Sequence, residues 1–202
     1  MTGEKKESKF IKLITESALI IFSVLLALII SEWKNNYNEK VQTEKMMANL
    51  KQEIIDNQNF ISSLLPYHEK VHEKLNNIIK TDSLEEKLFV DDSYFLWEVA
   101  PNGIIQGTLN DIVWSIAKTD KITNRISLKK SRILYEVYEQ QAIIDFTISK
   151  IIDLITSREI NSKVLLKENT ILLNSLFREV STQEKQLDYY YKNAIEILNE
   201  NE

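Results

Sequence analysis

Glycine is almost absent from this sequence, and its scarcity restricts the fold more than any other feature. The chain of 202 residues contains 3 glycines and 2 prolines, and no glycine lies between residues 4 and 102 or after residue 107. Glycine normally makes up about 7% of a protein, and it supplies the turns of β-sheets and the phosphate-binding loops of nucleotide-binding folds. Long helices need neither feature. The sequence therefore predicts an all-α protein.

The strongest local signal is an apolar run over residues 18–30, in which Ser23 is the only polar residue. The run alone is shorter than the roughly 20 residues that span a bilayer. Extended to residues 16–33, a helix covers about 26 Å at 1.5 Å per residue, close to the thickness of the hydrocarbon core. Trp33 ends this stretch, and Lys12 and Glu16 lie at its beginning. Aromatic and charged side chains of this kind are typical of membrane interfaces. We predict a transmembrane anchor over residues 13–33.

The run has two other interpretations, a cleaved signal peptide and a buried core helix. A cleaved signal peptide needs small residues before its cleavage site, whereas the run ends in Ile29, Ile30, Ser31 and Glu32. A core helix would be apolar on one face, whereas this run is apolar all round. Glu16 lies near the interface, four residues after Lys12, and is read as a local charge pair rather than a functional carboxylate.

The charges before the anchor predict its orientation. Lysines 5, 6, 9 and 12 are opposed only by glutamates 4 and 7. By the positive-inside rule, residues 1–12 form a short basic cytoplasmic N-terminus, and residues 34–202 lie outside the cytoplasm. The expected location is the inner membrane of a bacterial cell, in a single-pass signal-anchor arrangement with no second span after Trp33.

The domain beyond the anchor, residues 34–202, is predicted to be a long-helix bundle. Its first helix, over about residues 40–80, has core positions in a 3,4 heptad alternation, and Pro66 is expected to kink or split it near Leu65. The apolar stripe along this helix is wider than the a/d seam of a two-stranded coiled coil, and it favours packing in a bundle. The core positions are Met47, Leu50, Ile54, Asn57, Ile61, Leu64, His68, Val71, Leu75 and Ile78.

Shorter elements follow that helix. A connection with a short helix is expected over residues 81–90, a turn at 101–103, and a helix over 108–117. That helix is expected to bury Ile112 and Ile116 around Trp114, and Trp97 is also expected to be a core anchor. Two long helices follow, the first over about residues 128–158 and the second in the remaining C-terminal part, with a hinge around residues 159–163. Their expected core positions are Leu134, Val137, Gln141, Ile144, Ile148, Ile151 and Ile155, then Leu172, Leu176, Val180, Gln183, Leu187, Tyr190 or Tyr191, Ala194 and Leu198.

Two patches of the sequence resemble a widespread bacterial family of unknown function. The first has an acidic residue before the anchor and then a tryptophan followed by an Asn/Glu-rich stretch. The second has a tryptophan and an alanine leading into a V-Y-E-x-Q-like motif, although the glycine that members carry after the alanine is replaced here by Thr119, Asp120 and Lys121. The resemblance implies single-pass membrane proteins with a helical C-terminal domain and no established activity. The matching residues are Glu16, Trp33, Asn35, Asn36 and Glu39, then Trp114, Ala117, Val137, Tyr138, Glu139 and Gln141.

One motif has the form of a catalytic site. Residues 68–72 read HEKVH, and they contain the 2 histidines of the chain. On a helix, His68 and His72 share a face and can hold one zinc ion, with Glu69 as the base that polarises a water. Lys70 and Pro66 count against a metalloprotease helix, and His68 falls on the heptad seam. We therefore expect a structural role, with a membrane zinc hydrolase as the alternative.

Charge and cysteine content exclude further classes of function. The net charge is −5 and no basic face is visible, so no nucleic-acid partner is expected. The absence of cysteine excludes disulfides and thiolate chemistry. The expected function is a membrane-anchored tether or accessory subunit, without cofactor or catalysis. Its partners are the lipid bilayer and a second copy or another membrane protein. A ligand-sensing bundle that signals through a partner is the alternative.

Overall fold

The computed structural model describes the backbone of residues 4–91, 93–104 and 107–200, and within them all side chains except those of residues 4–11 and 85. Helices make up most of this part of the chain, so the protein is all-α, as predicted. The elements are α1 (Glu4–Lys80), α2 (Leu84–Leu88), β1 (Phe89–Val90), β2 (Ser93–Tyr94), α3 (Ile112–Thr119), α4 (Leu128–Thr156) and α5 (Leu166–Asn199), with short 3-10 helices η1 (Ile122–Asn124), η2 (Arg158–Asn161) and η3 (Lys163–Leu165).

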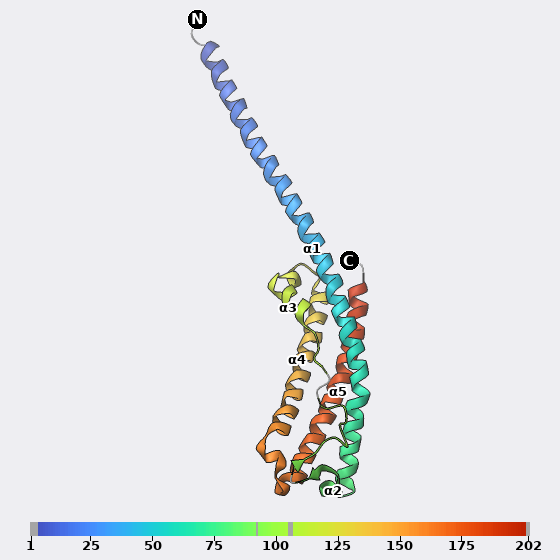
Figure 1. Cartoon of the computed structure of the whole chain (residues 1–202). Helices are drawn as coiled ribbons and strands as arrows, with labels where there is room; N and C mark the ends of the chain where they lie inside the picture. The colour runs from blue at the N-terminus through green and yellow to red at the C-terminus, as the bar shows by residue number, and fades with distance from the viewer. Residues whose placement is uncertain (1–3, 92, 105–106, 201–202) are drawn as a thin grey trace. The chain divides into compact units, whose positions relative to one another are not determined.

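The chain divides into two compact units, Met1–Lys45 and Met46–Glu202, and α1 contributes to both (Figure 1). The boundary lies beyond residue 33, where the anchor is predicted to end. The lysines at 5, 6 and 9, on which the predicted orientation depends, lie outside the described side chains. Each unit is therefore described by its own residues.

The first unit presents an apolar helix surface. The large apolar side chains between Leu13 and Ile30 are all exposed within the chain, and this part of α1 is long and apolar enough to cross a membrane. The Ser23 hydroxyl donates to the Leu19 carbonyl oxygen at 2.8 Å, so the one polar side chain of the apolar run is satisfied inside the helix. Lys12 and Glu16 lie 4.0 Å apart, as the charge pair predicts.

The second unit is built on three long helical segments. The α4 and α5 helices lie side by side along it (Figure 1). The part of α1 after residue 45 runs antiparallel to α5, because successive α1 residues bond to progressively earlier α5 residues. These bonds join Lys51 to Asn199, Gln58 to Asp188, and His68 to Glu184.

Two hydrophobic clusters form the core of this unit, and both contain residues of α1, α4 and α5. One is centred on Leu50, Ile54, Trp114, Leu134 and Leu187, and the other on Val71, Leu75, Leu88, Ile151 and Phe177. Short elements close each cluster. Trp114 and Ala117 of α3 belong to the first cluster, and α2 contributes to the second.

The heptad positions predicted for α1 are confirmed. Every position from Leu50 to Ile78 is buried, and Met47 is partly buried. The predicted split at Leu65 is wrong, because α1 continues through Pro66. Pro66 and Ser62, whose carbonyl loses its helical donor, are both exposed to water. Burial of Leu64 and His68 on the opposite side keeps the helix continuous.

Several predicted core positions are wrong. In α5, Leu173 and Phe177 are buried, whereas Leu172 is exposed. Leu173 follows Leu172 in the sequence and Phe177 follows Leu176, so the sequence offers two adjacent apolar stripes. Packing against α1 and α4 buries the stripe that contains Leu173 and Phe177. Ile112, Ile116 and Trp97 are exposed rather than buried.

A small hairpin replaces part of the predicted connection at 81–90. Strands β1 and β2 pair antiparallel, with Phe89 opposite Tyr94 and Val90 opposite Ser93. The predicted helix over 108–117 begins later, at Ile112, as α3. The predicted turn at 101–103 is present, with Gly103 at φ 79° and its N–H donating to the Ala100 carbonyl at 3.0 Å.

Candidate functional site

The HEKVH segment lies in the part of α1 that contacts α5. His68 is buried, and its Nδ1 lies 2.7 Å from Glu184 Oε1 of α5, which is also buried. The imidazole ring is flanked by the rings of Tyr67 and Phe177, each with its centroid 5.8 Å away. His68 therefore occupies a core position and forms a buried polar contact across two helices.

The other two residues of the motif also contact α5. Glu69 forms an ion pair with Lys185 at 2.6 Å. His72 Nδ1 donates to the Asn174 carbonyl oxygen at 3.2 Å. Glu69 is therefore paired with a lysine of α5 in this structure. Within the described residues, no group of three or more His, Cys, Asp or Glu side chains is close enough to hold a metal ion.

Glu184 is the partner that the sequence did not reveal. It is fully buried, and its Oε2 has no hydrogen-bond donor in the described structure. Its position completes the heptad spacing Leu173, Phe177, Val180, Glu184 and Leu187, and this spacing is the signal that could have identified it. A half-satisfied buried carboxylate is costly, so the contact with His68 carries much of its stabilisation.

A second buried carboxylate, Glu53 of α1, holds the start of α3. Its Oε2 accepts from Val113 N at 2.8 Å, and its Oε1 accepts from Trp114 N at 3.3 Å and from Tyr138 Oη at 2.6 Å. The N-cap residue of α3, Asp111, makes no side-chain capping bond. Glu53 therefore caps α3 from another helix and places a negative charge at its N-terminus.

Asn57, one helical turn further along α1, fixes the segment before α3. Its Nδ2 donates to the Asn110 carbonyl oxygen at 2.6 Å, and its Oδ1 accepts from Asn110 N at 2.9 Å. Asn57 is buried, as its heptad position predicts. Together, Glu53 and Asn57 explain why a helix as short as α3 has a defined place on α1.

Residues of the second patch of the family resemblance lie around Glu53 and the start of α3. The Trp114 ring stacks on the Tyr138 ring at 4.8 Å with an interplanar angle of 3°. Ala117 and Val137 are fully buried beside them. Gln141 Nε2 donates to Tyr191 Oη at 2.7 Å. The residues of the V-Y-E-x-Q-like motif, apart from the exposed Glu139, therefore build the core around α3.

Lys121 lies in the turn after α3, where the resemblance described above predicts a glycine. Its φ of 55° places it in the left-handed region, which glycine adopts without steric cost. The turn between α3 and η1 therefore has the backbone geometry of a glycine turn although a lysine makes it.

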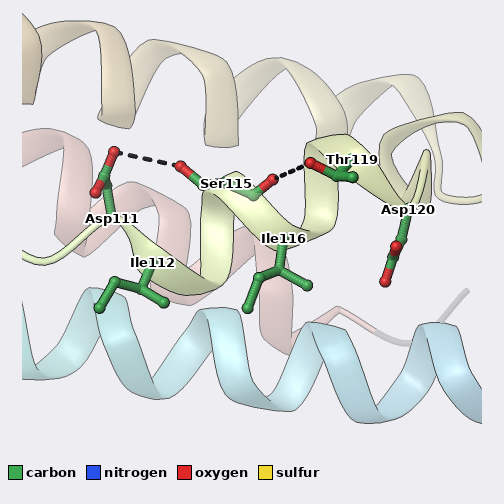
Figure 2. A pocket seen from close by; sticks show the side chains of 6 residues that line it. All are labelled: Asp111, Ile112, Ser115, Ile116, Thr119 and Asp120. Carbon is green, nitrogen blue, oxygen red and sulfur yellow. Dashed lines mark hydrogen bonds between the residues drawn. The ribbon is translucent and has the colours of Figure 1, made fainter.

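An open hollow of about 350 Å³ lies along α3, and Figure 2 shows the side chains that line it. Ile112 and Ile116 project from the same side of the helix, and Asp111 and Asp120 lie at its two ends. Ser115 Oγ lies 3.5 Å from Asp111 Oδ2, and Thr119 Oγ1 donates to the Ser115 carbonyl oxygen at 2.9 Å. The hollow offers two exposed isoleucines and two carboxylates, without a buried polar group directed into it.

Three tyrosines lose access to water on folding, and burial raises the pKa of each. Burial raises the pKa of Tyr94 to about 12. Burial also raises the pKa of Tyr138, and its bond to the Glu53 carboxylate raises it further. The pKa of Tyr191 is raised by burial, although the bond from Gln141 opposes the shift.

These shifts predict a loss of stability at alkaline pH. A tyrosine whose folded pKa is raised contributes its full stability below the unfolded pKa near 10, and that contribution falls as pH rises towards the folded pKa. Each such tyrosine should lower the unfolding free energy by about 1.4 kcal/mol per pH unit above pH 10. Urea unfolding at pH 8 to 11 measures this slope. Tyr191→Phe should reduce the slope by about one third, whereas Tyr189→Phe, on the exposed face of α5, should leave it unchanged.

Comparison with known proteins adds no relative to this description. No protein-family model, curated protein or solved structure matches the chain.

Proposed function

We propose that the chain is a single-pass membrane protein whose helical domain forms a bundle and acts as a tether or as an accessory subunit of a membrane complex. One observation carries the proposal: the apolar side chains of α1 between Leu13 and Ile30 are exposed all round the helix. An exposed apolar surface of this length needs a solvent other than water. A lipid bilayer supplies one.

The ends of this segment support the same assignment. Trp33 and Tyr37 are exposed, and their rings stack with centroids 6.4 Å apart. Aromatic rings of this kind favour the headgroup region of a membrane. At the other end, the Lys12–Glu16 pair supplies charges that favour the opposite interface. We place residues 13–33 in the bilayer of a bacterial inner membrane.

A reporter fusion tests the anchor and its direction. A reporter that is active only outside the cytoplasm, fused after Glu202, should be active, because the basic N-terminus stays inside. The mass of the membrane-extracted protein should include residues 1–33, since an anchor is not cleaved. Activity of a cytoplasm-only reporter at the same point would reverse the orientation, and a shortened mass would replace the anchor with a signal peptide.

We propose that the helical domain binds protein and performs no chemistry of its own. Among the described residues, the buried carboxylates and the buried imidazole are engaged in contacts between helices: Glu53 with α3, and His68 with Glu184. Crosslinking in intact membranes tests the interaction role. Specific products with a second copy or with another membrane protein would support it, whereas recovery of monomer alone would contradict it.

Elemental analysis tests the zinc hydrolase alternative. Because His68 is buried between the rings of Tyr67 and Phe177, and the described residues offer no group of three His, Cys, Asp or Glu side chains that could hold a metal ion, we expect the purified full chain to contain no stoichiometric zinc. Zinc at one equivalent that is lost in His68→Ala would support the enzyme instead. Glu139→Ala, an exposed change on α4, is the control for handling losses.

A further inference from the structure

The hairpin of β1 and β2 is fixed to the second unit by its inner side. Tyr94 N donates to Asn161 Oδ1 at 2.8 Å, and Tyr94 Oη lies 3.0 Å from Thr170 Oγ1. Phe89, Tyr94 and Leu96 pack against the core cluster that contains Leu88 and Phe177. The hairpin is therefore held on η2 and on the start of α5, and these contacts fix which of its faces lies against the core.

The opposite face of the hairpin is apolar and uncovered. Val90 pairs with Ser93, so it lies on the face of the two-stranded sheet opposite to Phe89 and Tyr94, and Phe95, whose N–H donates to the Leu88 carbonyl oxygen at 2.8 Å, continues this alternation. Trp97 lies beyond the strands, in the turn that begins two residues after Phe95. The exposed fractions of Val90, Phe95 and Trp97 are 46%, 49% and 66%, respectively. We call these three residues the outer face. A tryptophan exposed to this extent beside a phenylalanine and a valine is typical of a recognition surface rather than of a solvated loop.

The chain around the outer face is strongly acidic. Residues 82–98 contain six acidic residues, at positions 82, 85, 86, 91, 92 and 98, and one lysine, Lys87. The Lys87 ammonium lies 3.0 Å from Glu98 Oε1, and Lys74 of α1 donates to the Glu98 carbonyl oxygen at 2.7 Å, so both of these cations are already engaged. Glu86 and Asp91 are exposed. Negative charge around aromatic rings selects a cationic occupant.

We propose that the outer face binds a basic segment of a partner protein, one that carries lysine or arginine next to apolar side chains. Its apolar side chains cover Val90 and Phe95, its cationic groups lie over the ring of Trp97, and Glu86 and Asp91 pair with further basic groups. The proposal rests on the proposed interaction function and names the chemical class of the partner.

Anionic lipid is disfavoured by the same charges. Six carboxylates against one paired lysine repel a surface of phosphates, and they also repel an identical acidic segment of a second copy. A basic protein segment is the occupant that the charge pattern favours. Because part of the attraction is between exposed charges, binding should weaken as ionic strength rises.

A peptide-binding experiment on the full chain tests the proposal. The chain is reconstituted in phosphatidylcholine nanodiscs, and the probe is a fluorescein-labelled peptide in which lysine and arginine alternate with leucine. Anisotropy should report binding of this peptide and not of its glutamate counterpart. The affinity should fall at least about tenfold in Trp97→Ser and in Glu86→Gln/Asp91→Asn, which is about 1.4 kcal/mol. Asparagine keeps the left-handed backbone of Asp91, at φ 49°.

A matched control and three contrary outcomes make the test decisive. Tyr189→Ser removes an equally exposed aromatic side chain, 65% exposed on α5, and should leave peptide binding unchanged. Equal binding of the basic and acidic peptides would overturn the proposal. Trp97-dependent self-association in sedimentation, or Trp97-dependent binding to phosphatidylglycerol vesicles, would replace the partner with a second copy or with lipid. If the chain does not enter nanodiscs, the proposed anchor is contradicted instead. Peptide binding by that chain then tests the outer face independently of the anchor.

Discussion

Replacing Glu53 with alanine is expected to lower the free energy of unfolding by about 3 to 5 kcal/mol. The change leaves three donors without their acceptor: Val113 N, Trp114 N and Tyr138 Oη. Val113 is partly buried and the other two residues are buried, so water does not replace the carboxylate fully. Since the start of α3 depends on this carboxylate, Trp114 should also lose its stacking on Tyr138.

Urea unfolding of the full chain in detergent micelles, followed by far-ultraviolet circular dichroism, measures the loss. Glu53→Gln keeps the shape and one acceptor oxygen, so its loss should be intermediate. Glu139→Ala removes an exposed carboxylate beside Tyr138 and should change the free energy by less than about 0.5 kcal/mol. A loss below about 1 kcal/mol in Glu53→Ala would mean that the carboxylate does not hold α3.

The heptad seam of α1 could be predicted from the sequence because its apolar residues offer one spacing and no rival. The alternation of three and four continues from Leu50 to Ile78, and even Asn57 and His68 follow it into the core. In α5 the same pattern is right from Val180 to Leu187 and wrong at Leu172, which is exposed. Leu172 and Leu173 are adjacent, so local periodicity leaves two faces open, and contacts with α1 and α4 decide between them.

The polar contacts could not be predicted because each one joins residues far apart in the sequence. The capping of α3 comes from Glu53, 60 residues before Val113, and no local motif around α3 indicates it. The same reason explains the exposure of Ile112: a helical period predicts an apolar face, but the place at which Glu53 and Asn57 hold the helix decides which face is covered. The HEKVH motif was visible, whereas its partner Glu184 was not.

The pair of His68 and Glu184 predicts a strongly coupled double-mutant cycle. His68→Leu should lower the free energy of unfolding by about 3 to 5 kcal/mol, because it removes the partner that the described residues provide for a fully buried carboxylate. Glu184→Leu should cost less, about 1 to 3 kcal/mol, since an imidazole can remain neutral. The double variant should lie within about 2 kcal/mol of the natural chain, because leucine fills the space beside Phe177 without leaving a polar group unpaired.

The cycle separates a structural pair from a pair that is kept for its chemistry. If the contact serves only to satisfy two buried groups, the coupling energy should exceed about 2 kcal/mol and the double variant should fold and crosslink as the natural chain does. Additive losses would mean that the two residues contribute to stability independently and that the contact between them is not what keeps either in the core. Leu64→Ala, a core change one turn before His68, controls for packing loss alone, since it removes apolar contacts and creates no unpaired charge.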